Sequence, residues 1–163
     1  MGYKLQKADF FSESAVYGLV VVSTMLLVTN RYEATSHEVF VKVLGTVVVF
    51  WLAHAFSMAV SRMGMVADTK SPFRESLRYA SVHSLGLLIA AVVPLAIVLL
   101  GVVDLISDDT AVWIALWVDA ALLGLLGFFA SAAWTRKTSL RLRVGTGTAL
   151  LGVCIVLLKA FIH

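Results

Sequence analysis

Five apolar stretches alternate with short polar segments along the 163-residue chain. Each has about 20 mainly apolar residues, the length that an α-helix needs to cross the hydrocarbon core of a bilayer. The pattern predicts membrane-spanning helices at residues 10–29, 39–60, 79–103, 111–134 and 144–162. We therefore expect one domain, residues 1–163, folded as an all-α integral membrane protein with a bundle of about five transmembrane helices.

The composition supports this fold class. Hydrophobic residues make up 60% of the chain and charged residues 14%, whereas a soluble domain carries nearer a quarter charged residues. With so few charges, most of the surface cannot face water. The single cysteine, Cys154, lies inside an apolar stretch and has no intrachain partner, which excludes an internal disulfide.

The distribution of basic residues predicts the orientation. Ten of the 13 lysines and arginines fall on one side of the proposed bundle, in the N-terminal segment and in the loops around residues 61–78 and 135–143. Short loops rich in Lys and Arg stay in the cytoplasm, so we expect an N-in/C-out topology. Because topology also explains the net charge of +3, we expect no nucleic-acid partner.

Small residues recur at helical spacing in the last two predicted helices. One face carries Ala120, Gly124, Gly127 and Ser131, and the other Gly145, Thr148 and Gly152. Such faces let helix backbones approach closely in lipid, where packing drives association. Two uses are open: packing within the chain, which we favour, or the interface of a homo-oligomer.

Three ionisable residues from three different helices share one depth near the cytoplasmic side. At a rise of about 1.5 Å per residue, Glu13, His54 and His83 lie about 9, 12 and 7.5 Å beyond the flanking basic residues. Polar stripes accompany them, including Tyr17 on the face of Glu13. Ionisable groups inside a membrane are costly and are functional candidates by default. We expect these side chains to point into the bundle and form one cluster.

This cluster has three interpretations. Imidazole titrates near neutral pH, so a His–carboxylate set can relay protons. The same three groups, Glu13, His54 and His83, could bind a divalent metal. Alternatively, the histidines hydrogen-bond neighbouring helices and Glu13 lies near the interface, so that the set is only structural.

A second polar layer is predicted on the opposite side. Asp119 is well inside the fourth apolar stretch, and a lone carboxylate there is expected to hold a proton or find a cation. Lys42 and Lys159 lie near the same face and could pair with it. The alternative is that both lysines extend to the interface.

The first helix carries a family resemblance. Its sequence Lys7-Ala-Asp-Phe-Phe11-Ser12-Glu13 resembles the R-x-x-x-F-S-D opening of the endolysosomal potassium-channel family and its bacterial relatives. Phe50-Trp51 and His54 are similar to that family's second helix. The resemblance covers about a third of the chain, with Lys7 for Arg, Glu13 for Asp, and five spans rather than six. It implies an oligomeric cation channel with a first-helix pore, in which these residues form a supporting network.

Taken together, the sequence favours a small cation or proton channel or transporter that uses the Glu/His cluster. The alternative is a non-catalytic membrane assembly or partner subunit whose polar residues hold helices together. We find no hydrolase, metalloprotease or nucleotide-binding motif, so we expect neither enzymatic activity nor a cofactor. The expected partners are the lipid bilayer and further copies of the chain. Compactness and the lack of targeting features favour a multi-pass protein of the plasma (inner) membrane.

Overall fold

The computed structural model describes residues 3–29, 35–64, 71–133 and 135–162, with side chains for 13–29, 35–64, 71–132 and 135–161. The described chain is helical, without strands. Its elements are α1 (Tyr3–Thr29), α2 (Ser36–Met63), α3 (Pro72–His83), α4 (Leu85–Val102), α5 (Asp108–Ala130), the short 3₁₀ helix η3 (Ser131–Ala133) and α6 (Thr138–Ile162).

Four helical segments of the described chain are long and apolar enough to cross a membrane. They are α2, the continuous run of α3 and α4 (Pro72–Val102), α5 and α6; the apolar part of α1, Glu13–Thr29, is shorter. Large hydrophobic side chains are exposed on these helices, such as Phe56, Val92 and Phe129. Monomeric soluble proteins rarely expose so much apolar surface, so the fold is that of a helical, multi-pass membrane bundle.

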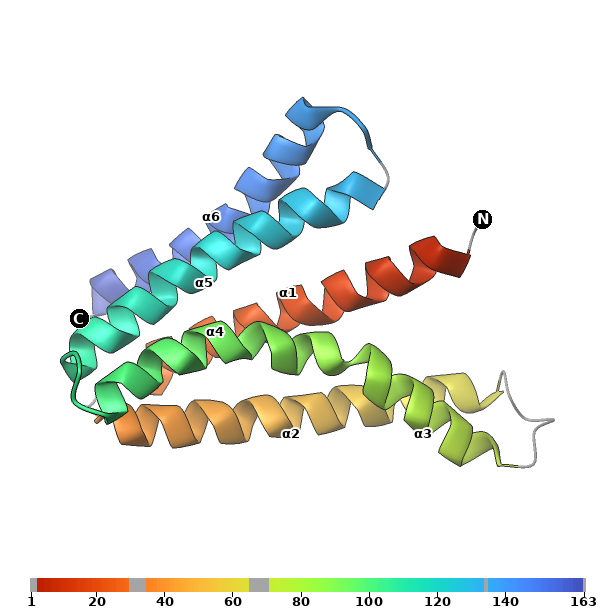
Figure 1. The fold of residues 1–163 in the computed structure, drawn as a ribbon, viewed down its shortest axis with the longest axis horizontal. Helices are drawn as coiled ribbons and strands as arrows, with labels where there is room; N and C mark the ends of the chain where they lie inside the picture. The colour runs from red at the N-terminus through yellow and green to blue at the C-terminus, as the bar shows by residue number, and fades with distance from the viewer. Residues whose placement is uncertain (1–2, 30–34, 65–70, 134, 163) are drawn as a thin grey trace.

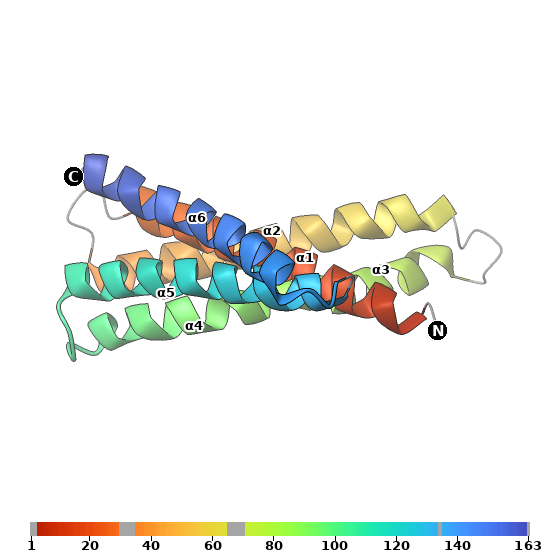
Figure 2. The same ribbon diagram turned by 90° about the horizontal axis from the view of Figure 1, so that it is seen from above.

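The helices run back and forth along the long axis of an elongated molecule, and the two termini lie at opposite ends (Figure 1). One end holds the starts of α2 and α5 and the ends of α1, α4 and α6, and we call it the C-terminal end of the bundle. The other holds the starts of α1, α3 and α6 and the ends of α2 and α5, and we call it the N-terminal end. Seen from above, α6 crosses at an angle over the helices beneath it (Figure 2).

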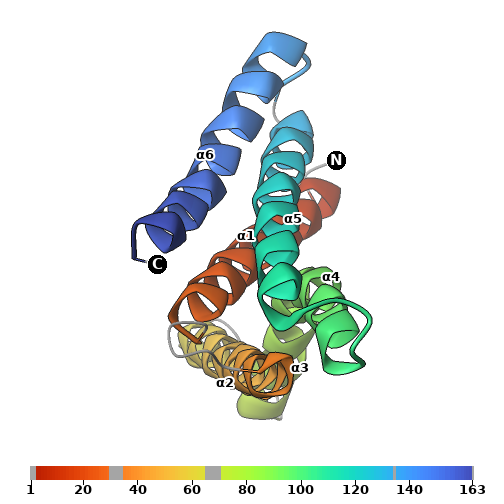
Figure 3. The ribbon, with the colours of Figure 1, turned by 90° about the vertical axis from the view of Figure 1, so that its left-hand side faces the viewer.

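The first helix, α1, is the centre of the bundle. It contacts every other α-helix and lies between the α5–α6 pair and the α2–α4 pair (Figure 3). The main core joins α1, α2, α4 and α5, and Val22, Val43, Leu87 and Leu116 are among its fully buried members. Any polar group on the inward faces of α1 is therefore enclosed by other helices.

The third predicted span, 79–103, differs from the structure. The helix begins earlier, at Pro72, and is divided at Ser84 into an amphipathic α3 and an apolar α4. Proline suits a helix start because the first turn leaves its amide groups unpaired. The starts of the other four predicted spans were also placed three to seven residues too late, because the polar first turns of a helix extend beyond its apolar stretch. The predicted ends at 29 and 162 coincide with the helix ends, the end at 60 lies three residues short of Met63, and the end at 134 lies past Ala130.

The small-residue faces of α5 and α6 pack against each other. A Cβ atom added to Gly145 would lie 2.9 Å from the carbonyl oxygen of Gly124, and one added to Gly152 would lie 2.6 Å from the Cα of Ala120. The two helix backbones are therefore in direct contact. This confirms packing within the chain as the use of these faces, so an oligomer would have to form through other surfaces.

At the C-terminal end, a short turn joins α4 to α5 and is tied to the start of α2. Asp104 takes a positive φ of 57°, a conformation that Asp tolerates better than most residues. The backbone N–H of Ser36 donates to Asp108 at 3.0 Å. Asp108 and Asp109 lie in the first turn of α5, where negative charge interacts favourably with the helix dipole.

Candidate functional site

Asp119 is the acidic side chain that is fully buried among the described residues. It is the twelfth of the 23 residues of α5 and is 0% exposed. Its position is about 16 Å along the helix from Asp108, which corresponds to the middle of a membrane span. Transfer of an unpaired carboxylate to such a place is very costly, so its contacts decide what it can do.

The partner of Asp119 is Ser23 on α1. The Ser23 hydroxyl donates a short hydrogen bond to Oδ2 of Asp119, and both residues are buried. The second carboxylate oxygen, Oδ1, has no hydrogen-bond partner among the described residues. The carboxyl group thus accepts one hydrogen bond, and its other oxygen is enclosed without a partner in the part of the chain that the structure describes.

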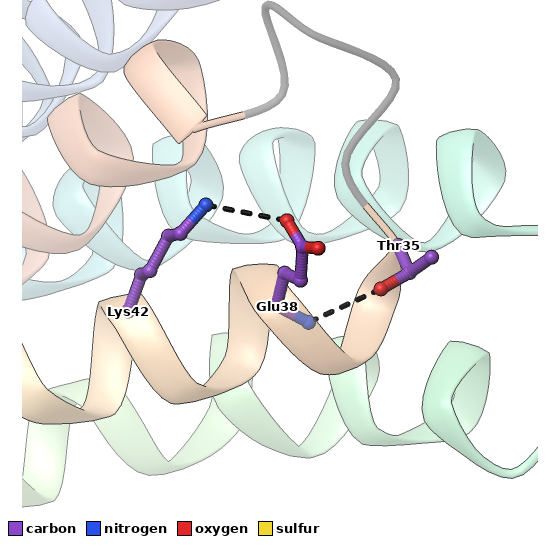
Figure 4. Close-up of polar contacts among 3 residues, drawn as sticks. All are labelled: Thr35, Glu38 and Lys42. Atoms are coloured by element: carbon purple, nitrogen blue, oxygen red, sulfur yellow. Dashed lines mark hydrogen bonds and ion pairs between the residues drawn. The ribbon is translucent and has the colours of Figure 1, made fainter.

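The predicted pairing of Asp119 with Lys42 or Lys159 is not found, because each lysine contacts a different acid. Lys42 Nζ lies 3.3 Å from Glu38 one turn earlier on α2, and both side chains are about half exposed (Figure 4). Lys159 Nζ lies 3.8 Å from Asp109 and 4.5 Å from the centre of the Trp113 ring. The exposed Lys42 side chain fits the alternative expectation of a lysine that extends to the interface, whereas the Lys159 amine is buried.

Part of the predicted inner cluster does come together. The rings of Tyr17 on α1 and His54 on α2 stack with centroids 5.9 Å apart, and Phe50 approaches the same tyrosine at 6.1 Å. Tyr17 is 43% exposed and His54 is half-buried. These three rings bridge α1 and α2 on the outer face of the bundle rather than in its interior.

His83 belongs to a second stack at the N-terminal end. The centroids of the His83 and Tyr79 rings are 3.7 Å apart. The central carbon of the Arg62 guanidinium lies 3.6 Å from the centroid of the Tyr79 ring. His83 Nδ1 is 2.8 Å from the backbone oxygen of Tyr79, and the His83 carbonyl accepts from Ser14 on α1 at 3.2 Å. The histidine thus sits at the break between α3 and α4, fixed to α1 through its backbone.

Glu13 does not point into the bundle as expected: its side chain is exposed. The inward face of α1 at this level is taken by Ser14, Ala15 and Gly18, and a Cβ on Gly18 would lie 2.7 Å from the carbonyl oxygen of Leu87. Such close packing against α4 leaves no room for a carboxylate. Within the described residues, no three His, Cys, Asp or Glu side chains are placed to hold a metal ion.

Several contact residues escaped the sequence analysis. Ser23 is the partner of Asp119, Arg62 and Tyr79 flank His83, and Asp109 and Trp113 hold Lys159. A search for hydroxyl groups at the depth of the lone acid would have found Ser23. Tyr79 lies one helical turn before His83, a spacing that the sequence does show. The contacts of Arg62, Asp109 and Trp113 depend on how helices rotate against each other, for which the sequence carries no comparable signal.

The structure describes the side chains of only some of the residues named by the channel-family resemblance. The side chains of Phe11 and Ser12 lie outside the described residues. Trp51 packs against the main core, and its indole Nε1 has no hydrogen-bond partner among the described residues.

The chain matches no protein-family model, no curated protein and no solved structure.

Proposed function

We propose that the chain is a membrane transport protein for protons or small cations, with Asp119 as the group that binds the ion inside the bilayer. The observation that carries this proposal is the surroundings of Asp119: complete burial at the middle of α5, one hydrogen bond from Ser23, and one oxygen without a partner within the described residues. Ionisable groups in this position commonly mark ion and proton pathways.

Contacts of α1 with three other parts of the bundle support a route along this helix. Three contacts join α1 to other helices: Ser14 to the backbone of His83, Tyr17 to His54, and Ser23 to Asp119. They follow one another from the N-terminal end to the middle of the bundle. In this proposal the titratable histidines serve the cytoplasmic approach and Asp119 is the central binding group.

The proposal includes the membrane topology. α1 runs antiparallel to α2 (Figure 1), so we count it as a fifth span, with its amino end in the cytoplasm as the basic residues indicate. We place the protein in the plasma membrane of a bacterium, as a multi-pass protein.

Flux measurements in liposomes test this function. The purified protein is reconstituted with a pH-sensitive dye inside the vesicles, and proton entry is recorded under an imposed potential. Asp119→Asn keeps an acceptor for Ser23 and nearly the same shape but cannot exchange a proton, so we expect most of the flux to disappear. Asp104→Asn is the matched control, because Asp104 lies in the exposed turn where Asn also accepts a positive φ.

Two results would contradict the proposal. One is wild-type liposomes without flux of protons, Na⁺ or K⁺ at confirmed protein incorporation. The other is an Asp119→Asn protein with unchanged flux. Either result would favour the non-conducting assembly subunit, in which the hydrogen bond between Ser23 and Asp119 only holds α1 to α5.

A further inference from the structure

A groove of about 740 Å³ lies open on the outer face of the bundle between α1 and α2. Its walls are mainly apolar, and its lining includes Met25 and Val28 from α1 and Val41, Gly45 and Val49 from α2. The volume is in the range of small-molecule sites in proteins, about 300–1,000 Å³. Because both helices belong to a membrane bundle, the groove faces the lipid phase.

The groove has a closed end and a polar end. Phe50 lines its inner end and meets Tyr17 of the facing helix at 6.1 Å, so aromatic rings join α1 to α2 there. Lys42 and Thr29 line the opposite end. From Val41 to Phe50 the helix rises about 14 Å, close to half of the roughly 30 Å hydrocarbon thickness of a bilayer. The groove is therefore as long as one leaflet is deep.

The charges at the polar end follow a definite order. Glu38 is in the first turn of α2, and Lys42 is one turn further into the membrane. The lysine side chain extends back along the helix to the glutamate, and their charged atoms are 3.3 Å apart (Figure 4). Both side chains are more than half exposed, so both are accessible to a ligand.

We propose that this groove binds one glycerophospholipid with an ethanolamine headgroup. One acyl chain fills the apolar groove as far as Phe50, the phosphate binds Lys42, and the terminal ammonium binds Glu38. The order of the lipid's groups, from hydrocarbon to phosphate to ammonium, is the order of the protein's groups along α2. This inference does not depend on ion transport by Asp119, which lies in another part of the bundle.

The charge pattern selects among lipids. An anionic headgroup with no ammonium binds Lys42 through its phosphate but offers no cation to Glu38, so it fits less well. A choline headgroup presents a quaternary ammonium that cannot donate a hydrogen bond, whereas a primary ammonium donates charge-assisted hydrogen bonds to a carboxylate. The pair of Lys42 and Glu38 therefore favours ethanolamine over both alternatives.

Gly45 allows the groove to be filled without disturbing the fold. A Cβ atom added there meets no other atom within 4 Å, so Gly45→Leu places a side chain in the space assigned to the acyl chain. Gly147 on α6 has the same open surroundings and is not part of the groove, which makes Gly147→Leu the matched control. Val49→Trp, at a position 62% exposed, fills the same groove from a second site.

The experiment is a lipid titration followed by native mass spectrometry. Delipidated protein in detergent receives phosphatidylethanolamine, phosphatidylcholine or phosphatidylglycerol with identical acyl chains, and the dissociation constant of the first bound lipid is measured. We expect phosphatidylethanolamine to bind most tightly. Gly45→Leu and Val49→Trp should each weaken that binding about tenfold, the effect of excluding roughly two methylene groups from the groove, and Gly147→Leu should leave it unchanged.

The headgroup assignment has its own variants. Glu38→Gln should abolish the preference for ethanolamine over glycerol, and Lys42→Gln should weaken all three lipids. Equal wild-type affinity for the three lipids would overturn the headgroup assignment. Unchanged binding in both groove-filling variants, each with wild-type circular dichroism, would overturn the site itself. Neither result would bear on the flux of the Asp119→Asn protein, so the two proposals fail independently.

Discussion

Adding one methyl group at Gly152 should force α5 and α6 apart. The new Cβ would lie 2.6 Å from the Cα of Ala120, 2.7 Å from its Cβ and 3.2 Å from a methyl carbon of Leu123. Carbon atoms prefer separations of about 3.5–4.0 Å, and the nearest atom belongs to backbone that cannot rotate away. The helices must therefore separate locally by about 1 Å in the Gly152→Ala protein.

The cost follows from the contacts that this separation weakens. A gap of about 0.5–1 Å forfeits a quarter to a half of each contact's ~0.1–0.2 kcal/mol. Over some tens of atom pairs in the α5–α6 interface the loss is about 1–3 kcal/mol, the range measured for overpacked cores. Alanine's better helix propensity returns at most about 1 kcal/mol. We expect a net loss of about 1–2 kcal/mol in the free energy of unfolding.

Equilibrium unfolding in mixed micelles, followed by circular dichroism, measures this loss. Gly147→Ala is the control, since the added methyl meets no atom within 4 Å and should leave stability unchanged or slightly raised. A Gly152→Ala protein as stable as Gly147→Ala would refute the close contact of α5 and α6, and with it the conclusion that the small-residue faces are used within the chain.

Two further predictions concern the C-terminal end of the bundle and the topology. In the same micelle assay, Asp109→Ala should lower the free energy of unfolding by about 1–3 kcal/mol, because the buried Lys159 amine loses its ion-pair partner. Lys159→Met should be nearly neutral, because the Asp109 side chain is 63% exposed and water can hydrate it. In a Cys154→Ser background, an impermeant thiol reagent added outside intact cells should label Ser107→Cys and not Ser71→Cys; the reverse pattern would overturn the N-in/C-out orientation.

The elements themselves were largely predictable because long apolar stretches leave few alternatives to a membrane helix. The α2, α5 and α6 helices contain almost all of their predicted spans, and the small residues of α5 and α6 anticipated their contact. Span starts were less accurate, because polar first turns such as the one containing Asp108 remain helical outside the apolar stretch. The break at Ser84 has no comparable signal in the sequence.

The candidate site was predictable in depth but not in partners. Shared depth brought Glu13 and His54 into one predicted cluster, and the structure places Glu13 on the exposed face of α1 instead. Depth fixes a coordinate along the helix, whereas contact also requires the rotation of each helix about its axis. That rotation is set by close approaches such as Gly18 against Leu87, which depend on the whole packing arrangement.

Side-chain length decides whether a charged group on a membrane-spanning helix can reach the C-terminal end of the bundle. Lys42 and Lys159 each have a four-carbon stem, and both reach acids at the C-terminal end of the bundle. Asp119 has a single methylene and starts about 16 Å from that end, so its carboxyl group must remain where the backbone puts it. Ser23 binds one of its oxygens, and in the proposed function a proton or a small cation binds the other. A residue held in that condition is the one whose replacement tests function rather than topology.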